Sequence, residues 1–385
     1  MGERIFVTGA GGCLGGRLVQ RLVLGSREVA VEPLVHRLSG AGAMRLARLP
    51  VDVHQGSVTD RDRMDELMAD CDAVVHCAVG DREATVTGTR TVLAAAEDAG
   101  VETFVYICSG SIHGHDFEGV LTEDAPIEPD TEYGEWKADA AAVVDEYRTG
   151  GGMQPTSIRP FIVYGPFSEF VRAPVETLKE GAILTDGGHG TVNQIYVDNL
   201  VDAVLLALER PAARGEVYLA VDDDPVTWRR YLHTLGEHLE EHPPIDGKTS
   251  TEIRLGAGLS YAAANVVPPV RAIARAATSP DVRQATAAEF RRTPWAMGTY
   301  ARMPEPVRAA VRGAFTDGDP PLFPAAPSNG TVERSWPSER YRKMHRSTGR
   351  LSNEKLKAEL GWEQQVGFEE AMALIGDWLA YQYMQ

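Results

Sequence analysis

The sequence predicts an α/β fold in which a doubly wound parallel sheet has helices on both faces. From residue 1 to about 165, short apolar runs rich in β-formers alternate with amphipathic helical patterns, and a glycine-rich turn joins the first two. The expected strands are 5–8, 29–35, 51–54, 73–77, 103–108 and 156–158, and helices are expected, for example, at 60–69, 85–99 and 136–147. Ligands bind such sheets at the carboxyl ends of the strands, where the motifs below fall.

The remaining sequence predicts a second, smaller domain that is discontinuous and mostly helical. Residues 1–165 are expected to form the nucleotide-binding domain, to which the segment 191–222 returns with a strand, a long helix and another strand. The substrate-binding domain then spans 166–385 and includes a proline-rich insertion at about 240–340. At the end, 352–355 is typical of a helix start and 360–362 of its stop, before a last helix through Trp378.

A glycine-rich turn follows the first strand. Gly9, Gly12 and Gly15 are spaced three apart, and the helical pattern begins within the same stretch. Gly9 lets the chain leave the strand in a conformation that most residues avoid, Gly12 places no Cβ near a pyrophosphate, and Gly15 lets the helix pack closely. The helix start at Cys13 and Leu14 offers backbone N–H groups to phosphates. The turn therefore predicts a Rossmann-type dinucleotide site.

Composition narrows the range of partners. The chain has 38 Lys and Arg against 55 Asp and Glu, a net charge of −17. Such a surface repels phosphate backbones and anionic lipids, so nucleic acid is not expected as a partner and a membrane is disfavoured. The four cysteines show no metal-type pairing and fit free thiols in a reducing cytosol. The first residues lead directly into a strand, which leaves no room for a signal peptide, and a cytoplasmic location is expected.

Two short stretches supply groups for proton transfer. Tyr133 and Lys137 lie one helical turn apart on one face. A free tyrosine has a pKa near ~10, and a nearby ammonium lowers it, so Tyr133 can exchange a proton with a carbonyl or an alcohol. A Tyr-x-x-x-Lys spacing alone is common in helices. Upstream, a predicted strand ends in two hydroxyls, Ser109 and Ser111, ahead of Gly114.

Together these motifs resemble the extended short-chain dehydrogenase/reductase superfamily, the NAD-dependent epimerase/dehydratase type. The resemblance implies that Ser109, five residues before Gly114, polarises the substrate oxygen and that Tyr133 moves the proton. It further implies that Lys137 lowers the Tyr133 pKa and holds the nicotinamide ribose. Ser111 is a second substrate contact. Related enzymes dimerise through the helix that bears the tyrosine, so a homodimer is expected.

Further segments match the family in order and spacing over residues 1–222 and the final forty. Residues 159–166 match the family's Arg-Pro-x-x-Val-Tyr-Gly-Pro, 74–78 the fourth-strand end under the cofactor, and 56–60 a stretch near the adenine. Residues 193–198 resemble the segment that leads into the domain-bridging helix. The cofactor contacts implied are Ser57, Val58, Cys77, Ala78, Pro160 and Val163. Ser57 stands where the family usually has an acid.

The end of the second strand bears on the choice between NAD and NADP. An NAD site places a carboxylate there to hold the ribose hydroxyls. Here Glu32 falls inside the predicted strand, and Arg37 follows its end. Arg37 is suited to a 2′-phosphate, which favours NADP over NAD, unless this arginine is only a solvated surface charge.

Several reactions remain open within this family. Gly110 and Ser111 stand where a sugar 4,6-dehydratase has Asp-Glu, which disfavours dehydration. Thr191 and Val192 stand where UDP-sugar 4-epimerases typically carry an arginine, although Arg172 or the basic run 340–346 could hold a diphosphate. The leading prediction is an NAD(P)-dependent oxidoreductase or epimerase acting on a nucleotide-linked sugar. One alternative is an NADP-dependent reductase or dehydrogenase of a steroid-like or isoprenoid-like alcohol or ketone, in which the apolar stretch at 255–273 forms a lid or rests on a membrane surface. The other is a non-catalytic cofactor-binding protein.

Overall fold

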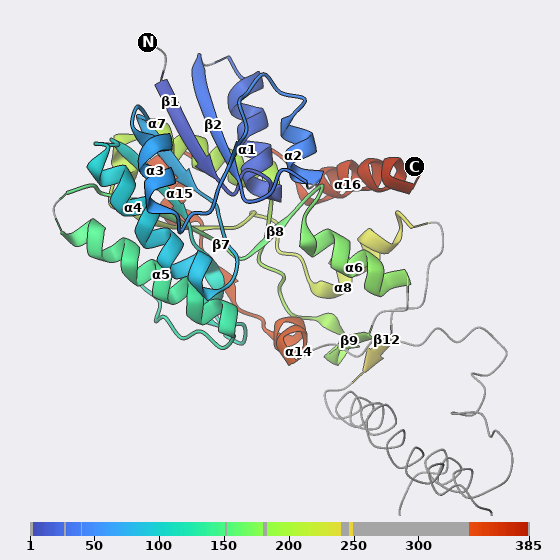
Figure 1. Cartoon of the computed structure of the whole chain (residues 1–385). Coiled ribbons are helices and arrows are strands. Elements are labelled where there is room, and N and C mark those ends of the chain that lie inside the picture. Colours follow the sequence, from blue (N-terminus) through green and yellow to red (C-terminus); the bar gives the residue numbers. More distant parts are fainter. Residues whose placement is uncertain are drawn as a thin grey trace, which may run out of the picture.

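The computed structural model describes residues 3–26, 28–39, 41–150, 152–179, 183–239, 246–248 and 339–383 (Figure 1). The proposed lid at 255–273 lies outside these residues, as does most of the expected insertion at 240–340.

A seven-stranded sheet forms the centre of the part that is predicted to bind the nucleotide. Its order is β11-β7-β5-β4-β1-β2-β3, and every neighbouring pair is parallel. The strands are β1 (Glu3–Thr8), β2 (Val29–Val35), β3 (His54–Gln55), β4 (Ala73–His76), β5 (Thr103–Ile107), β7 (Thr156–Pro160) and β11 (Val217–Ala220). This confirms the doubly wound parallel sheet. All these strands begin at or near the expected residues except β3.

The third strand is shorter than predicted and displaced along the chain. Only Leu34↔His54 and Val35↔Gln55 pair at this edge of the sheet, so the prediction of a strand over 51–53 is wrong. The side chains of Val51 and Val53 still pack against the core, which explains the apolar pattern. Their burial does not require ladder hydrogen bonds.

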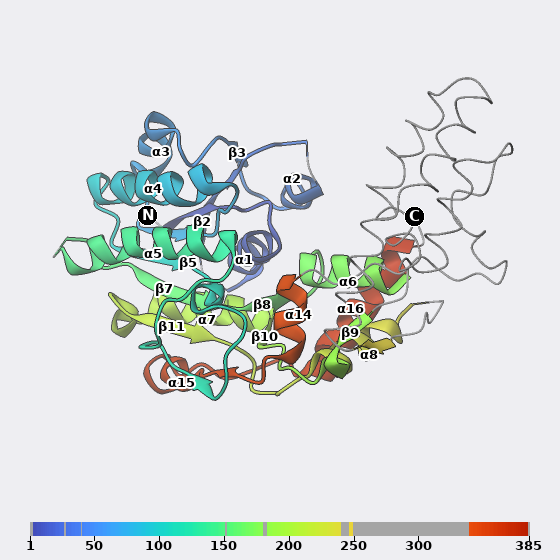
Figure 2. The same cartoon turned by 90° about the horizontal axis from the view of Figure 1, so that it is seen from below.

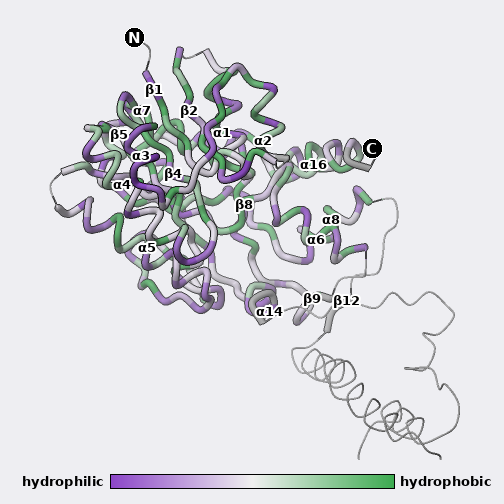
Figure 3. Tube along the Cα trace, in the orientation of Figure 1, coloured by the Kyte–Doolittle hydropathy of each residue, from purple (hydrophilic) through white to green (hydrophobic). Residues whose placement is uncertain are grey.

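Alternation along the strands divides the core into two layers. Ile5, Val7 and Val75 face one apolar cluster, while Phe6 and Val74 face the other. The first layer is covered by α1 (Cys13–Leu24), α2 (Ala41–Leu46), α7 (Val197–Glu209) and α15 (Glu354–Leu360). The second is covered by α3 (Arg61–Met68), α4 (Gly88–Asp98), which follows the π-helical turn η1 (Glu83–Thr87), and α5 (Glu132–Thr149) (Figure 2). Hydrophilic residues mark the outer turns of α3 and α5 (Figure 3).

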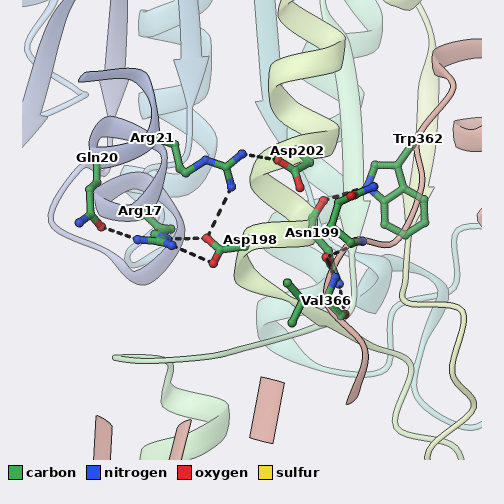
Figure 4. A network of polar contacts seen from close by, with 9 residues as sticks. Arg17, Gln20, Arg21, Asp198, Asn199, Asp202, Trp362 and Val366 are labelled. Carbon is green, nitrogen blue, oxygen red and sulfur yellow. Dashed lines mark hydrogen bonds and ion pairs between the residues drawn. The ribbon is translucent and has the colours of Figure 1, made fainter. Parts of the chain in front are cut away.

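Ion pairs fasten α1, the helix after the glycine turn, to α7 (Figure 4). Arg17 makes a two-point contact with Asp198, and its Nη2–Oδ2 distance is 2.9 Å. One turn further along, Arg21 Nη2 lies 2.6 Å from Asp202 Oδ1. A bidentate arginine–carboxylate ion pair fixes the relative orientation of the two helices as well as their distance. The glycine turn, which leads into α1, is therefore held in a fixed position relative to α7.

The C-terminal segment returns to the same helix α7. Asn199 Nδ2 donates to Asp222 Oδ1 and to the carbonyl of Val366, each at 2.8 Å, and Trp362 Nε1 donates to the Asn199 carbonyl at 2.9 Å (Figure 4). As predicted, a helix begins within 352–355, at Glu354, and ends at Leu360, before Gly361, whose φ of 65° is in the left-handed region. The last helix, α16 (Phe368–Tyr383), passes Trp378 as expected.

A third apolar cluster lies beyond the sheet. Buried aromatic rings dominate it, among them Tyr164, Trp228, Tyr231 and Phe368, whose centroids lie about 6 Å apart. Its helices are α6 (Glu169–Lys179), α8 (Trp228–Gly236), α14 (Glu339–Arg346) and α16, and the short strands beside them are β8 (Ile162–Tyr164), β9 (Ile183–Thr185), β10 (Gln194–Tyr196) and β12 (Asp246–Lys248). The remaining elements are β6 (Val120–Leu121), β13 (Arg350–Leu351) and the 3₁₀ turns η2 (Gly110–His113), η3 (Asp186–Gly188) and η4 (Pro211–Ala213). Where one domain ends and the other begins stays a prediction.

Within the described residues, no helix combines the length and apolar character that crossing a bilayer requires.

Candidate active site

The glycine turn is too tight for side chains at two of its three glycines. Gly9 has φ of 67°, and a Cβ there would lie 2.7 Å from the backbone nitrogen of Ala78. At Gly15 a Cβ would lie 2.4 Å from the Gly9 carbonyl oxygen. The helix α1 then begins at Cys13 with no side-chain cap and no acidic residue in its first turn. Its terminal N–H groups and its dipole therefore suit a phosphate, and the turn fits a dinucleotide.

A cavity of about 470 Å³ opens beside this turn. Six of the residues expected to contact the cofactor line it: Gly9, Gly12, Ser57, Val58, Cys77 and Ala78. They come from the ends of β1 and β4, which are neighbours in the sheet, and from the segment after β3, which lies beyond β2 on the same side of β1. The cavity thus lies at the carboxyl ends of the strands, as the sheet predicts.

The end of β2 reaches this cavity through a residue that the sequence did not single out. His36, rather than Arg37, lines the cavity, and Arg37 is exposed. Glu32 lies inside β2, as predicted, where it contacts His54 Nε2 at 2.7 Å and Arg4 at 3.2 Å. Its carboxylate is therefore committed to neighbouring side chains.

The expected contacts at the other side of the turn are more dispersed. Leu14 packs against both the sheet core and the apolar cluster that contains Tyr164 and Trp228. Cys13 donates its Sγ–H to the Pro166 carbonyl at 3.4 Å, and burial raises its pKa to about 11, so it stays a thiol. Pro160 ends β7 and Val163 lies in β8, and neither lines the cavity beside the turn.

Arg45 of α2 stabilises the glycine turn through hydrogen bonds to its carbonyl groups. Its Nη2 donates to the carbonyls of Gly11 at 3.1 Å and Gly12 at 3.0 Å. The same guanidinium stacks over the Phe167 ring, 4.1 Å from its centroid. Arg45 was missed in the sequence because its partners lie more than thirty positions away.

Helix α5 carries the proton-transfer pair. Thr131 caps it by accepting from the Gly134 N–H at 3.1 Å, which sets the start of the helix just before Tyr133. Lys137, only 3% exposed, donates through Nζ to the Ile107 carbonyl at 2.7 Å and to the Tyr106 hydroxyl at 3.3 Å. Burial lowers the pKa of Lys137, and the nearby thiols of Cys108 and Cys77 oppose that shift.

A second cavity, of about 160 Å³, brings the predicted hydroxyls together. Ser109, Ser111 and Tyr133 all line it. The Oγ atoms of the two serines are 2.8 Å apart, and the Ser111 N–H donates to Ser109 Oγ at 3.2 Å. Ser109 caps the turn η2 in this way, which fixes its side chain at the end of β5.

Three further residues line this second cavity and were not predicted: His115, Phe161 and Phe170. His115 Nδ1 lies 2.6 Å from Asp130 Oδ1, and Lys343 Nζ donates to Asp130 Oδ2 at 3.0 Å. The His115 ring meets Phe161 edge-on at 5.2 Å. Phe161 belonged to a recognised motif, but nothing in the local sequence indicated His115.

The basic residues considered for a diphosphate are placed differently. Arg172 is exposed on α6. In α14, Lys343 pairs with Asp130 and Arg346 with Asp116. These two cations tie α14 to the segment that follows η2. Across the described ranges, no group of three His, Cys, Asp or Glu side chains is arranged to hold a metal ion.

Comparisons with known proteins agree with this geometry. The model of the NAD dependent epimerase/dehydratase family matches residues 5–220. A ketoreductase of 4-hydroxy-2-methyl-3-oxo-4-farnesyl-3,4-dihydroquinoline-1-oxide from Stigmatella aurantiaca is 32% identical over 249 residues, covering 61% of this chain and 72% of the relative. The UDP-glucose 4-epimerase of Vibrio cholerae is 26% identical over 264 residues, covering 63% and 77%. Streptomyces venezuelae DesIV, a dTDP-glucose 4,6-dehydratase solved with NAD, superposes with a TM-score of 0.66 at 19% identity, covering 99% and 98%.

The chain therefore belongs to the NAD dependent epimerase/dehydratase family and is an enzyme of that family. The fold and the family predicted from the glycine turn and the Tyr-x-x-x-Lys pair are confirmed.

Proposed function

We propose that this enzyme transfers a hydride between a nicotinamide dinucleotide and a hydroxyl or carbonyl carbon of a nucleotide-linked sugar, as an oxidoreductase or an epimerase. One observation carries the proposal: Ser109, Ser111 and Tyr133 line a single cavity of about 160 Å³, and Lys137 lies on the same helix as Tyr133. These are the groups that a carbonyl–alcohol interconversion requires.

The nicotinamide, when bound, supplies the hydride chemistry. On the protein side, Tyr133 gives a proton to the carbonyl oxygen during reduction and takes it back during oxidation. The ammonium of Lys137 favours the phenolate form of Tyr133. When the Ser109 hydroxyl donates to the substrate oxygen, the Ser111 hydroxyl at 2.8 Å donates to Ser109, so the pair acts as one directed donor.

The substrate class is supported by the relatives. The Vibrio cholerae relative is named as an epimerase of UDP-glucose, and the Thermotoga maritima UDP-glucose 4-epimerase, solved with UDP-glucose, has the same fold at a TM-score of 0.65. A second candidate is an apolar ketone. Phe161 and Phe170 on the cavity wall favour it, as does the farnesylated substrate named for the Stigmatella aurantiaca relative.

For the cofactor we propose NADP over NAD. Glu32 is engaged with His54 and Arg4, and the end of β2 offers His36 and Arg37 instead of a carboxylate. A 2′-phosphate suits cations and hydrogen-bond donors, whereas ribose hydroxyls suit a carboxylate.

The first test is the mass and absorbance of any nucleotide released when the purified protein is denatured. Tightly held NAD(H) would indicate a cofactor recycled in each turnover, hence an epimerase, and would contradict NADP. A site that is empty as purified, and that binds added NADPH more tightly than NADH, is the expected result for a reductase.

The second test is turnover. The protein is incubated with NAD(P)⁺ or NAD(P)H and UDP-glucose, dTDP-glucose, UDP-glucuronate or a prenylated ketone, with Tyr133→Phe as the inactive control. Conversion of a nucleotide sugar supports the proposal, and conversion of the apolar ketone alone replaces it with the second candidate. Cofactor binding without any conversion favours a non-catalytic role. Light scattering tests the homodimer that the family resemblance implies.

A further inference from the structure

A series of buried polar side chains connects the residue before the glycine turn to Lys137. Thr8 Oγ1 lies 2.7 Å from His76 Nδ1, and His76 Nε2 lies 3.1 Å from Thr89 Oγ1. The Tyr106 hydroxyl accepts from Lys137 Nζ at 3.3 Å, and the Thr89 side chain is close enough to Tyr106 to oppose the rise in its pKa that burial causes. All five residues are at most 3% exposed. Polar groups so deeply buried are costly unless paired, and here they satisfy one another.

Ring contacts reinforce the same series of side chains. The His76 ring stacks on that of Tyr106 with centroids 5.8 Å apart and planes 22° from parallel. Lys137 Nζ lies 4.8 Å from the centroid of the Tyr106 ring. The Tyr106 ring therefore contacts both the imidazole and the ammonium.

The donors and acceptors have a single consistent arrangement. The Thr89 hydroxyl donates to the Thr85 carbonyl at 2.6 Å, so its oxygen accepts from His76 Nε2–H. The Ala78 N–H donates to Thr8 Oγ1 at 3.2 Å, and the Thr8 hydroxyl then donates to His76 Nδ1. The imidazole is neutral, because burial and the nearby ammonium of Lys137 lower the pKa of His76 to about 3.

This arrangement has a direct consequence for Lys137. An ammonium has three N–H donors, and the Ile107 carbonyl and the Tyr106 hydroxyl take two of them. One donor is left for the reaction site. Since the Thr89 hydroxyl donates its proton to a backbone carbonyl, the series of polar side chains does not carry protons to solvent. It instead fixes the orientation of Lys137.

The other end of the series touches the phosphate-binding turn. Thr8 directly precedes Gly9, and Ala78, which donates to Thr8, is the residue that a Cβ on Gly9 would meet at 2.7 Å. Both Gly9 and Ala78 line the cavity beside the turn.

We propose that Tyr106, Thr89 and His76 are positioning residues that aim the remaining donor of Lys137 into the site and mechanically couple it to the glycine turn. This rests on the proposed role of Lys137 in the site. Neither these three residues nor Lys137 lines the cavity that holds Ser109 and Tyr133, and Lys137 is linked to that cavity through α5, the helix that also carries Tyr133.

The decisive variant is Tyr106→Phe, with Tyr218→Phe as the matched control. Tyr218 is equally buried in the same sheet, its hydroxyl donates to Glu359 at 2.8 Å, and Lys355 Nζ lies 5.2 Å from its ring centroid. Tyr218 is thus a second tyrosine beside a lysine, but it does not belong to the series of buried polar side chains described above. A second pair is Thr89→Val, which removes the shared acceptor, and Thr89→Ser, which keeps it. Thermal unfolding shows that each variant folds.

Two quantities are measured. Selective ¹⁵N labelling of lysine gives the Lys137 titration by NMR, with the signal assigned by its loss in Lys137→Met. Fluorescence titration gives the dissociation constants of NADH and NADPH. In Tyr106→Phe the pKa of Lys137 is expected to fall by at least one unit, because the buried ammonium loses an acceptor, and cofactor binding is expected to weaken at least fivefold. Thr89→Val is expected to shift the Lys137 pKa and the cofactor dissociation constants in the same directions. In Tyr218→Phe and Thr89→Ser the Lys137 pKa is expected to stay at its wild-type value and the dissociation constants within twofold of the wild type.

Unchanged Lys137 titration and unchanged cofactor binding in both Tyr106→Phe and Thr89→Val would overturn the inference. If the Lys137 titration responds but no form of the protein binds NADH or NADPH, the positioning of the lysine stands. In that case the proposed function fails.

Discussion

His115, on the wall of the cavity that holds Ser109 and Tyr133, forms a close pair with Asp130, with Nδ1 and Oδ1 2.6 Å apart. Burial acts to raise the pKa of Asp130, but hydrogen bonds from His115 and Lys343 outweigh it and hold that pKa below its usual value. The carboxylate therefore stays charged near neutral pH and keeps the proton of His115 on Nδ1.

The first prediction concerns this pair. His115→Gln is expected to lower kcat/KM at least tenfold with the substrate that the turnover test identifies, because the cavity loses an imidazole oriented by a carboxylate. NADPH binding is expected to stay within twofold. The matched control is His113→Gln: His113 is also buried and donates to the Pro126 carbonyl at 2.8 Å, but it does not line the cavity. An equal loss in both variants would contradict a specific role for His115.

The second prediction concerns the proton carrier. Tyr133→Phe keeps the ring on the cavity wall and removes the hydroxyl. Turnover is expected to fall by about 10²-fold or more, the usual size of a general acid–base contribution, while the dissociation constant for the cofactor changes less than twofold. Steady-state kinetics and fluorescence titration separate the two effects. Wild-type turnover in this variant would eliminate the mechanism.

The third prediction concerns the support behind the glycine turn. Arg45→Met removes the charged donor to the Gly11 and Gly12 carbonyls, and hydrogen bonds to charged groups contribute roughly 1.5–3 kcal/mol. We expect NADPH to bind about tenfold more weakly, measured by titration calorimetry. Arg48→Met, which alters an exposed arginine just beyond the same helix, is expected to leave the affinity unchanged. Equal affinities for the two variants would show that the turn holds its shape without Arg45.

The fourth prediction concerns acid stability. Burial lowers the pKa of His345 to about 4, whereas an unfolded histidine titrates near ~6.5, so protons bind the unfolded chain first. Stability is thus lost as pH falls from about 6.5 towards 4, and the arithmetic gives about 2 kcal/mol between pH ~7.5 and ~5. The difference in unfolding free energy between the wild type and His345→Asn should shrink by that amount in urea titrations.

The comparison with a variant matters because other groups titrate in the same range. Burial raises the pKa of Asp222 to about 7, so this carboxyl stabilises the fold increasingly as pH falls through 7 towards its unfolded value. That contribution has the opposite sign and is common to the wild type and the variant. A difference in unfolding free energy that stays constant with pH would show that His345 titrates normally in the fold.

Most of the fold and part of the candidate site could be predicted from short stretches of sequence. Gly9, Gly15 and the Tyr133–Lys137 pair could be recognised because each rule involves only a few neighbouring residues: a positive φ, a close approach, one helical turn. The parallel sheet followed from alternation of apolar strands and helices. The third strand was misplaced because valines that pack partly buried against the core give the same pattern with or without ladder hydrogen bonds.

What could not be predicted depends on contacts between distant parts of the chain. His115 gains its meaning from Asp130 and from Lys343, which is more than two hundred residues away. Arg45 reaches a turn more than thirty positions earlier. His36 and Arg37 are adjacent, and only the exact course of the chain after β2 decides that His36 lines the cavity. No periodicity or spacing rule contains that information.

The return of the C-terminal segment also bears on synthesis. Leu356, Leu360 and Trp362 belong to the same core layer as Ile5 and Val7, although the last strand of the sheet ends at Ala220. On the ribosome, the first 220 residues emerge with that face of α7 and β11 uncovered until the final forty residues are made. A gene truncated after the sheet would produce a chain with an exposed apolar seam, a substrate for chaperones and proteases. Full-length translation is therefore needed to complete the core layer on this face of the sheet.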